Sequence, residues 1–200
     1  ALVWDAAGPV GGYLAPAPKV GDFDPNSPGL EIITARSYMD TAASVFMYSA
    51  TGALLWSFNK PGHAPEGFSV GDIDNDGYVD LLLGTQWLRN NGTSWTTYTL
   101  NDASGNPDRN RLADINKDGL LDAVVGFEAI SVDGKLAWYE QGSSTVSIWT
   151  EHVIANVVGP MSLDVADMDK DGDNDVVVGE HNLSAPSSAK LYVFENVDGK

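Results

Sequence analysis

The chain has 200 residues, with 28 acidic and 11 basic side chains, so its formal net charge at pH 7 is -17. This charge repels nucleic acid backbones and anionic lipid surfaces, so we expect no nucleic-acid partner. No apolar run approaches the ~20 residues of a membrane-spanning helix, and we expect no membrane insertion. The chain has no cysteine, which excludes disulfides, zinc–thiolate sites and a cysteine nucleophile.

The acidic residues are clustered in four segments of similar pattern. Their first acids, Asp22, Asp72, Asp114 and Asp167, recur at intervals of 50, 42 and 53 residues. Repeats of 40–50 residues with strand-like content are typical of β-propellers. We therefore predict an all-β protein of four-stranded antiparallel blades, one for each of residues 10–60, 61–103, 104–155 and 156–200.

Each unit contains recognisable strand signals and no convincing amphipathic helix. In the second unit, residues 67–70 lead into the acidic segment. An uninterrupted apolar run, such as residues 176–178 in the last unit, leaves the segment and indicates an inner strand buried on both faces. The aromatic segments 95–100 and 149–154 share a Trp-Thr pattern and alternate as outer strands do. We expect the tryptophans of these strands to pack in the core.

The ends of the repeat array leave two alternatives open. The last unit lacks a fourth strand, and residues 1–5 contain an isolated strand-like segment with Trp4. Either residues 1–5 complete the last blade and close a four-bladed ring, or the four blades belong to a larger propeller of seven or eight blades. We favour the larger propeller, because an open array leaves unpaired strand edges. No leader sequence is present, so we expect any export signal to have been removed.

Three of the acidic segments have the spacing of a calcium loop. Oxygen-bearing side chains recur at every second residue around a glycine turn, and Ca²⁺ takes 6–8 such oxygen ligands. The alternative is a turn that hydrogen-bonds to itself without metal, but three copies in one register favour about three structural calcium ions. The expected ligands, with Tyr78, Leu120 and Asp173 contributing carbonyls, are Asp72, Asp74, Asp76, Tyr78, Asp80, Asp114, Asn116, Asp118, Leu120, Asp122, Asp167, Asp169, Asp171, Asp173 and Asp175.

The first acidic segment departs from this pattern. It is one residue longer between Asp22 and Glu31, and Pro25 and Pro28 stiffen it. We expect no calcium there.

The sequence resembles the FG-GAP/VCBS repeat family through its D-x-[DN]-x-D-G-x-x-D loops, each followed by a Val/Leu run. This resemblance covers nearly the whole chain. It implies a β-propeller in which structural calcium lies on one face of the disc and ligands bind on the opposite face. Over residues 21–25 and 28–31 the chain also resembles, more weakly, the propellers of rhamnogalacturonan lyases.

Residues that follow the inner strands are expected on the face opposite the acidic loops. There we expect acids, histidines and an aromatic ring, groups that suit sugar recognition. A polysaccharide lyase would need a base to remove a proton from the sugar and a cation to neutralise the uronate. Arg109 is preceded by Asp108, and we also expect these two residues to form a local ion pair. The candidate ligand-binding residues are Trp87, Gln86, Glu128, Glu180 and His181, and the candidate catalytic residues are His181, Tyr38, Arg36 and Arg109.

Three functions remain open from the sequence. The first is an extracellular or cell-surface propeller, stabilised by calcium, that binds a polysaccharide, a glycan or another extracellular protein in recognition or adhesion. The second is a polysaccharide lyase of the rhamnogalacturonan or ulvan type, or the propeller of one. The third is a purely structural repeat of a surface or fibre protein. No known catalytic motif is present, so we lean against an enzyme. An extracellular location follows from the millimolar calcium that such loops require.

Overall fold

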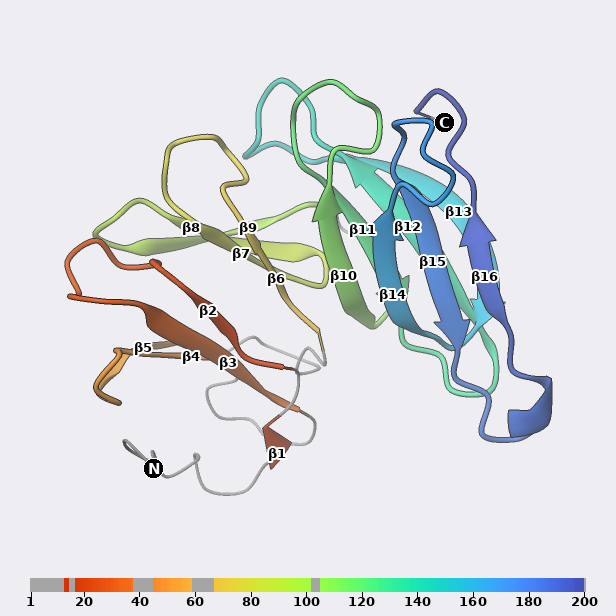
Figure 1. Cartoon of the computed structure of the whole chain (residues 1–200), viewed down its shortest axis with the longest axis horizontal. Coiled ribbons are helices and arrows are strands. Elements are labelled where there is room, and N and C mark those ends of the chain that lie inside the picture. The colour runs from red at the N-terminus through yellow and green to blue at the C-terminus, as the bar shows by residue number, and fades with distance from the viewer. Residues whose placement is uncertain (1–12, 15–16, 38–44, 59–66, 102–104, 200) are drawn as a thin grey trace.

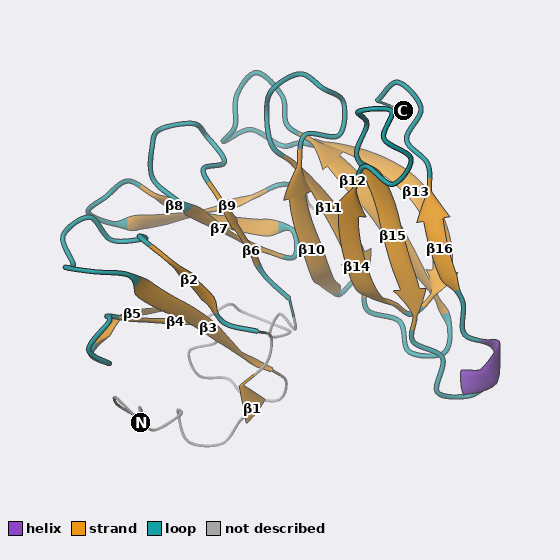
Figure 2. Cartoon of the chain, viewed as in Figure 1, coloured by secondary structure: helices purple, strands orange, loops and turns teal. Residues whose placement is uncertain are grey.

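The computed structural model describes residues 13–14, 17–37, 45–58, 67–101 and 105–199. Four antiparallel sheets are arranged as the blades of a β-propeller (Figure 1), which confirms the predicted fold class. The only helical element in the described part is a short 3-10 turn, η1 (Pro186–Ser188), visible in Figure 2 beside the last sheet. No helix in the described residues is long and apolar enough to span a membrane.

The first two sheets follow one another in the chain. The first consists of β1 (Tyr13–Leu14), β2 (Lys19–Gly21), β3 (Glu31–Ser37), β4 (Val45–Tyr48) and β5 (Leu54–Phe58). The second consists of β6 (Ser69–Gly71), β7 (Asp80–Leu83), β8 (Gln86–Asn90) and β9 (Trp95–Thr99), joined in chain order.

The third and fourth sheets repeat this topology with one difference. The third consists of β10 (Pro107–Ala113), β11 (Asp122–Phe127), β12 (Asp133–Glu140) and β13 (Thr150–Val158). The fourth has three described strands, β14 (Pro160–Ala166), β15 (Asp175–Glu180) and β16 (Leu191–Phe194). The fourth blade thus lacks an outer strand among the described residues, as the sequence predicted. Residues 1–5, expected as a candidate for that strand, lie outside the described residues, and the number of blades in a complete ring stays a prediction.

The inner strands form the hydrophobic core between the blades. Strand β7 is buried at every position, and so is β11, which confirms the prediction from their uninterrupted apolar runs, whereas Val177 of β15 is only partly buried. Apolar clusters fill the junction between each pair of consecutive blades. Burial of this apolar surface is the main favourable contribution to folding.

Glycines allow two of these junctions to close tightly. Gly84 and Gly126 each stand four residues after the last acid of their loop. A Cβ atom would lie 2.6 Å from the carbonyl oxygen of Pro107 at Gly84, and 2.3 Å from that of Pro160 at Gly126. Both prolines begin the first strand of the following blade. The glycine therefore sets how closely one blade approaches the next.

Candidate functional site: three acidic loops

The loops of residues 72–80, 114–122 and 167–175 connect the first and second strands of the last three blades. We call them the second, third and fourth acidic loops. In Figure 1 the third and fourth lie at the end to which β10 and β14 point, whereas the connection that follows β15 lies at the opposite end. In these two blades, the acidic loops and the ends of the inner strands therefore occupy opposite faces, as predicted.

The three loops share one backbone conformation. The glycine at their sixth position has positive φ in every copy, with 94° at Gly77, 87° at Gly119 and 92° at Gly172. The fourth position is also left-handed, at Asn75, Lys117 and Lys170. Side chains other than glycine and asparagine seldom adopt this region. The same double turn in all three loops points to a backbone held in place by specific contacts.

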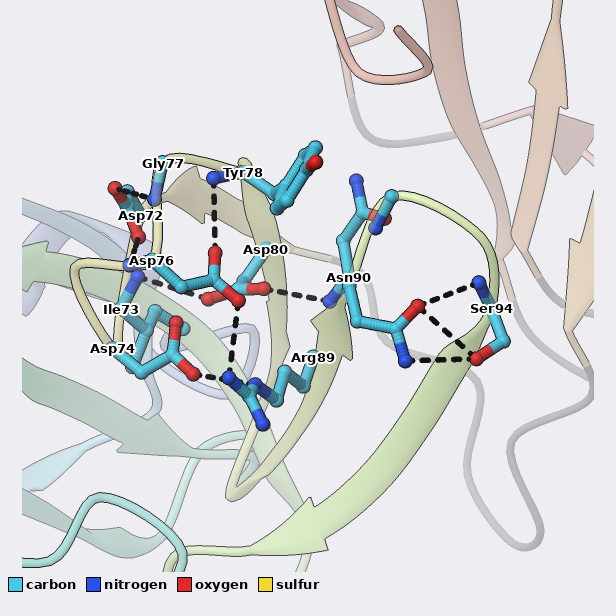
Figure 3. A network of polar contacts seen from close by, with 12 residues as sticks. Asp72, Ile73, Asp74, Asp76, Gly77, Tyr78, Asp80, Arg89, Asn90 and Ser94 are labelled. Carbon is cyan, nitrogen blue, oxygen red and sulfur yellow. Dashed lines mark hydrogen bonds and ion pairs between the residues drawn. The ribbon is translucent and has the colours of Figure 1, made fainter. Parts of the chain in front are cut away.

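The first aspartate of each loop supplies some of these contacts. In the second loop, the Asp72 carboxylate accepts hydrogen bonds from the amides of Asp76 and Gly77, at 3.0 and 2.9 Å (Figure 3). Asp114 and Asp167 accept the corresponding glycine amides at 2.9 and 3.1 Å. Each first aspartate thus stabilises the turn through hydrogen bonds to backbone amides.

The last aspartate of each loop joins the loop to the third strand of its blade. Asp80 is fully buried, and its two oxygens accept the amides of Ile73 at 2.9 Å and Asn90 at 2.7 Å. Asp122 and Asp175 make the same pair of bonds, with distances of 2.9–3.0 Å. Burial raises the pKa of Asp80 to about 7, although the two backbone hydrogen bonds lower it. It likewise raises the pKa of Asp122 to about 6.

The second and fourth loops bring three carboxylates together. Oxygens of Asp72, Asp74 and Asp80 lie within 4.8 Å of one another, and so do those of their counterparts in the fourth loop, Asp167, Asp169 and Asp175. In the third loop the position of Asp74 is taken by Asn116, whose amide donates to Asp118 at 3.3 Å and to Glu140 at 3.1 Å. Carboxylates this close repel one another unless a cation or a proton intervenes.

Two basic residues that the sequence analysis did not single out contact these loops. The guanidinium of Arg89 lies 2.5 Å from Asp74 and 3.1 Å from Asp76 (Figure 3). Lys117 of the third loop forms an ion pair with Asp173 of the fourth. Burial and the neighbouring Asp76 raise the pKa of Asp74, and Arg89 opposes this effect. No fixed spacing relates either cation to the loop it contacts, so the sequence pattern gave no signal for them.

An amide side chain at or just after the end of each third strand links consecutive blades. The side-chain nitrogens of Asn90, Gln141 and Asn196 donate to the carbonyls of Phe23, Ile73 and Ile115 in the preceding blade, at 2.8, 3.1 and 2.8 Å. The same residues donate their backbone amides to the last aspartates of the loops. The acidic loop, the third strand and the preceding blade therefore form one hydrogen-bonded unit. The sequence offered only a weak signal, an amide residue that follows Arg or Glu at the end of an aromatic strand.

The first acidic segment closes on a glutamate. The Oε2 atom of buried Glu31 accepts the amides of Phe23 at 2.9 Å and Asp24 at 3.1 Å. The longer side chain thus reproduces the bond that Asp80 makes to Ile73. The expectation of no calcium in this segment stays a prediction.

The structure corrects one candidate on the opposite face. Trp87 was expected there as an aromatic ring on which a sugar could stack. It is instead fully buried and stacks on Tyr98, with ring centroids 5.1 Å apart. The correction has a simple cause, because β8 continues through Trp87 and directs its ring into the junction with the third blade. Trp87 therefore cannot present its face to a ligand.

Other candidates on that face have structural partners. Glu180 accepts hydrogen bonds from the Tyr192 hydroxyl at 3.0 Å and the Lys190 amide at 2.9 Å. Arg109 pairs with Asp108 at 3.2 Å, which confirms the expected ion pair, and it also donates to the carbonyl of Met161 at 2.7 Å.

The remaining candidates differ in how much of them the structure describes. Gln86, Glu128 and His181 are partly exposed. The His181 amide donates to the carbonyl of Gly159 at 2.8 Å. Arg36 lies in β3 opposite Leu14, without a described side chain. Tyr38 lies outside the described residues. The lyase set that the sequence suggested therefore stays a prediction.

Two protein-family models match the chain. The model of the FG-GAP-like repeat matches residues 114–178, which contain the third and fourth acidic loops. The model of the FG-GAP repeat matches residues 64–96, which contain the second. A comparison with curated proteins gives no match.

Proposed function

Because the chain belongs to the FG-GAP repeat family, we propose that it is a calcium-stabilised propeller module that works outside the cell as a binding or adhesion domain. In this proposal the acidic loops hold calcium for structural reasons. The opposite face binds a glycan, a polysaccharide or an extracellular protein.

One observation carries the proposal: the same oxygen-rich loop recurs three times, and in two of the copies three carboxylates come together. The second and fourth loops each gather three carboxylates within 4.8 Å. In the second loop, the Oδ1 atom of Asp74 is buried and has no hydrogen-bond partner. A buried acceptor without a partner is costly, and a bound cation would satisfy it. The residues present therefore fit a metal ion.

Calcium suits these loops better than magnesium. Carboxylates and a backbone carbonyl at alternate positions supply the several oxygen ligands that calcium takes in flexible geometry. Magnesium demands rigid octahedral coordination and retains its water molecules. The expected ligands at the first, third and fifth positions of each loop are also at least partly exposed, so an ion has access from solvent. Extracellular modules of this kind bind calcium at about 10⁻⁴–10⁻³ M, which supports a location outside the cell.

The metal would stabilise the junctions between blades as well as the loops. The last aspartate of each loop is bonded to the residue that donates to the preceding blade, as with Asp175 and Asn196. Binding energy at the loop therefore adds to the stability of the whole array.

The binding proposal is favoured over catalysis by the partners of the candidate residues. Arg109 is held between Asp108 and Met161, and both oxygens of Glu180 accept hydrogen bonds. A net charge of -17 also disfavours a polyanionic substrate. Neutral or calcium-bridged polysaccharides are consequently the better ligand class.

A glycan array probed with the labelled chain tests this function, in about 1 mM calcium and again in EDTA. We expect binding to a restricted set of neutral or weakly acidic glycans, and weaker binding once calcium is removed. A matched variant, His181→Ala, should reduce binding without lowering the melting temperature. If the chain bound neither glycans nor extracellular matrix proteins, a purely structural repeat would be the remaining function. Absorbance from an unsaturated product with a uronate polymer would instead establish a lyase.

A further inference from the structure

A pocket of about 380 Å³ lies at the junction between the first and second blades. Two aromatic rings line it, those of Trp56 in β5 and Trp95 in β9, and they stack with centroids 4.9 Å apart. Its rim is polar, because it includes side chains of the first acidic segment and of residues 91–94, the turn between β8 and β9. The pocket thus combines an aromatic floor with a polar rim.

The equivalent tryptophan of the next blade is covered by its own chain. Trp149 immediately precedes the outer strand β13, as Trp95 begins the outer strand β9, and it is 1% exposed. Within the longer turn of residues 142–148, the carbonyl of Thr145 accepts the indole N–H of Trp149 at 2.9 Å. The shorter turn of residues 91–94 leaves Trp95 partly exposed, and none of the described residues accepts its indole N–H. The first junction therefore leaves open a place that the second junction fills.

The rim of the pocket is held in place by hydrogen bonds across the junction. The side-chain nitrogen of Asn26 donates to the carbonyl of Gly92, and that of Asn90 donates to the carbonyl of Phe23, each at 2.8 Å. Gly92 has a φ of 80°, and a Cβ atom there would lie 2.7 Å from the ring of Tyr78. Glycine therefore allows the turn to pack closely against the second acidic loop. Walls that are fixed before binding reduce the entropic cost of holding a ligand.

The polar groups of the rim suit a neutral ligand that carries hydroxyl groups. The Oδ1 atom of Asp24 accepts the amide of Asn26 at 2.9 Å, and none of the described residues donates to its Oδ2 atom. The hydroxyls of Thr93 and Ser94 donate to Asn91 at 3.0 and 3.2 Å, so their lone pairs face outward from these bonds and can accept. Among the described residues that line the pocket, one is a carboxylate and none is basic. The rim therefore repels anions and accepts hydroxyl donors.

We propose that this pocket binds a pyranose residue of a neutral glycan. The apolar C–H face of the sugar stacks on the indole of Trp95, and its hydroxyls bond to the rim and to the indole N–H. Ligand pockets span about 300–1,000 Å³, so this one takes about one or two sugar rings. The inference rests on the proposed function in taking a glycan as the ligand.

The pocket is a second glycan site, apart from the face of His181. In an antiparallel sheet alternate turns lie at the same end, so residues 91–94 share an end of the second blade with its acidic loop. The rim residues Asp24 and Asn26 belong to the first acidic segment, where we expect no calcium. Sugar binding in this pocket is therefore independent of the metal, provided that the chain is folded.

Short oligosaccharides provide the probes. They are neutral tetrasaccharides of glucose, mannose, galactose and N-acetylglucosamine, with tetragalacturonate as an anionic counterpart of the same length. Binding to the full chain is followed by calorimetric titration and by tryptophan emission, in calcium and in EDTA. We expect saturable binding of at least one neutral tetrasaccharide, with a Kd on the order of 0.1–1 mM. Tetragalacturonate should bind at least about tenfold more weakly.

Variants of the full chain locate the sugar. Trp95→Ala removes the stacking ring and should weaken binding by about tenfold or more. Trp95→Phe keeps an aromatic face without the indole N–H and should weaken binding by about two- to fivefold. Asn26→Asp adds a second carboxylate to the rim, leaves the aromatic floor intact and should weaken binding by about three- to tenfold. Thr97→Ala is the matched control, since Thr97 is exposed on the same strand outside the pocket, and should change nothing.

Melting curves show which variants remain folded, because Trp95 also packs in an apolar cluster. The proposal would be overturned if no neutral tetrasaccharide bound at millimolar concentration, if tetragalacturonate bound more tightly, or if folded Trp95→Phe and Asn26→Asp kept the original affinity. Array binding that His181→Ala abolishes and the Trp95 variants leave intact would reject this site and retain the proposed function. Sugar binding that the Trp95 variants lose and that EDTA leaves unchanged would support this site, even if the acidic loops bound no calcium.

Discussion

Replacement of Asp122 by alanine separates the two roles that we assign to the acidic loops. Asp122 is fully buried, and its oxygens accept the amides of Ile115 at 3.0 Å and Gln141 at 2.9 Å. Alanine leaves two buried donors without acceptors, at about 1–3 kcal/mol each. Burial of the charge, which raises the Asp122 pKa to about 6, offsets part of this cost. We therefore expect unfolding in EDTA at pH 7.5 to become easier by roughly 2–4 kcal/mol, or about 5–15 °C in melting temperature.

Asp118→Ala is the matched control in the same loop. Asp118 is exposed, and its carboxylate accepts the amide of Leu120 at 2.8 Å and the side-chain amide of Asn116. In EDTA this variant should lose no more than about 1 kcal/mol. In calcium both variants should lose, in addition, the stabilisation supplied by the third loop's ion. Differential scanning calorimetry in EDTA measures the stability lost with the hydrogen bonds. The same measurement in calcium adds the stability lost with the bound ion. An equal loss for both variants in EDTA would refute the hydrogen-bonding role of Asp122.

Three further predictions follow from described contacts. Gly126→Ala places a Cβ atom 2.3 Å from the Pro160 carbonyl oxygen, and should reduce the free energy of unfolding by about 1–3 kcal/mol in urea titrations. Burial alone would raise the Glu151 pKa, but hydrogen bonds from Lys135 and a tyrosine hold it below its usual 4.5. This carboxylate thus stabilises the fold above its unfolded pKa, and the contribution is lost as pH falls through the folded pKa. Glu151→Gln should accordingly flatten the decline of melting temperature between pH 5 and 3; an unchanged slope would contradict this. Arg89→Ala removes a cation that contacts two expected ligands, and should tighten calcium binding at the second loop by about tenfold in a calorimetric titration. Unaltered affinity would show that the arginine does not compete.

The architecture could be predicted because the repeat carries its signal in local sequence. An acidic turn followed by an apolar run, as at residues 72–83, fixes the position of the first two strands of a blade. The Trp-Thr segments fix the fourth. The described part of the fourth blade contains three strands, and residues 195–200 contain no Trp-Thr segment.

The contacts between blades could not be predicted in this way. Asn90 stands 10 residues after Asp80, whereas Asn196 stands 21 residues after Asp175. The hairpin between the second and third strands varies in length, so no constant spacing marks the bonded pair.

Trp87 was misplaced for a related reason. The face that a side chain occupies depends on where the strand turns and where the next strand begins. The hydrophobic pattern did not reveal the tight turn at Gly84, so it did not show that Trp87 belongs to the next strand.

The most direct test of the calcium proposal is a calorimetric titration of the metal-free chain with calcium. It should be paired with melting curves in calcium, in magnesium and in EDTA. We expect about three binding events, and a melting temperature that rises with calcium and far less with magnesium. Asp72→Ala should remove one of these events and leave the others. No binding heat, together with the same melting temperature in calcium and in EDTA, would show that the acidic loops are metal-independent turns and would contradict the account.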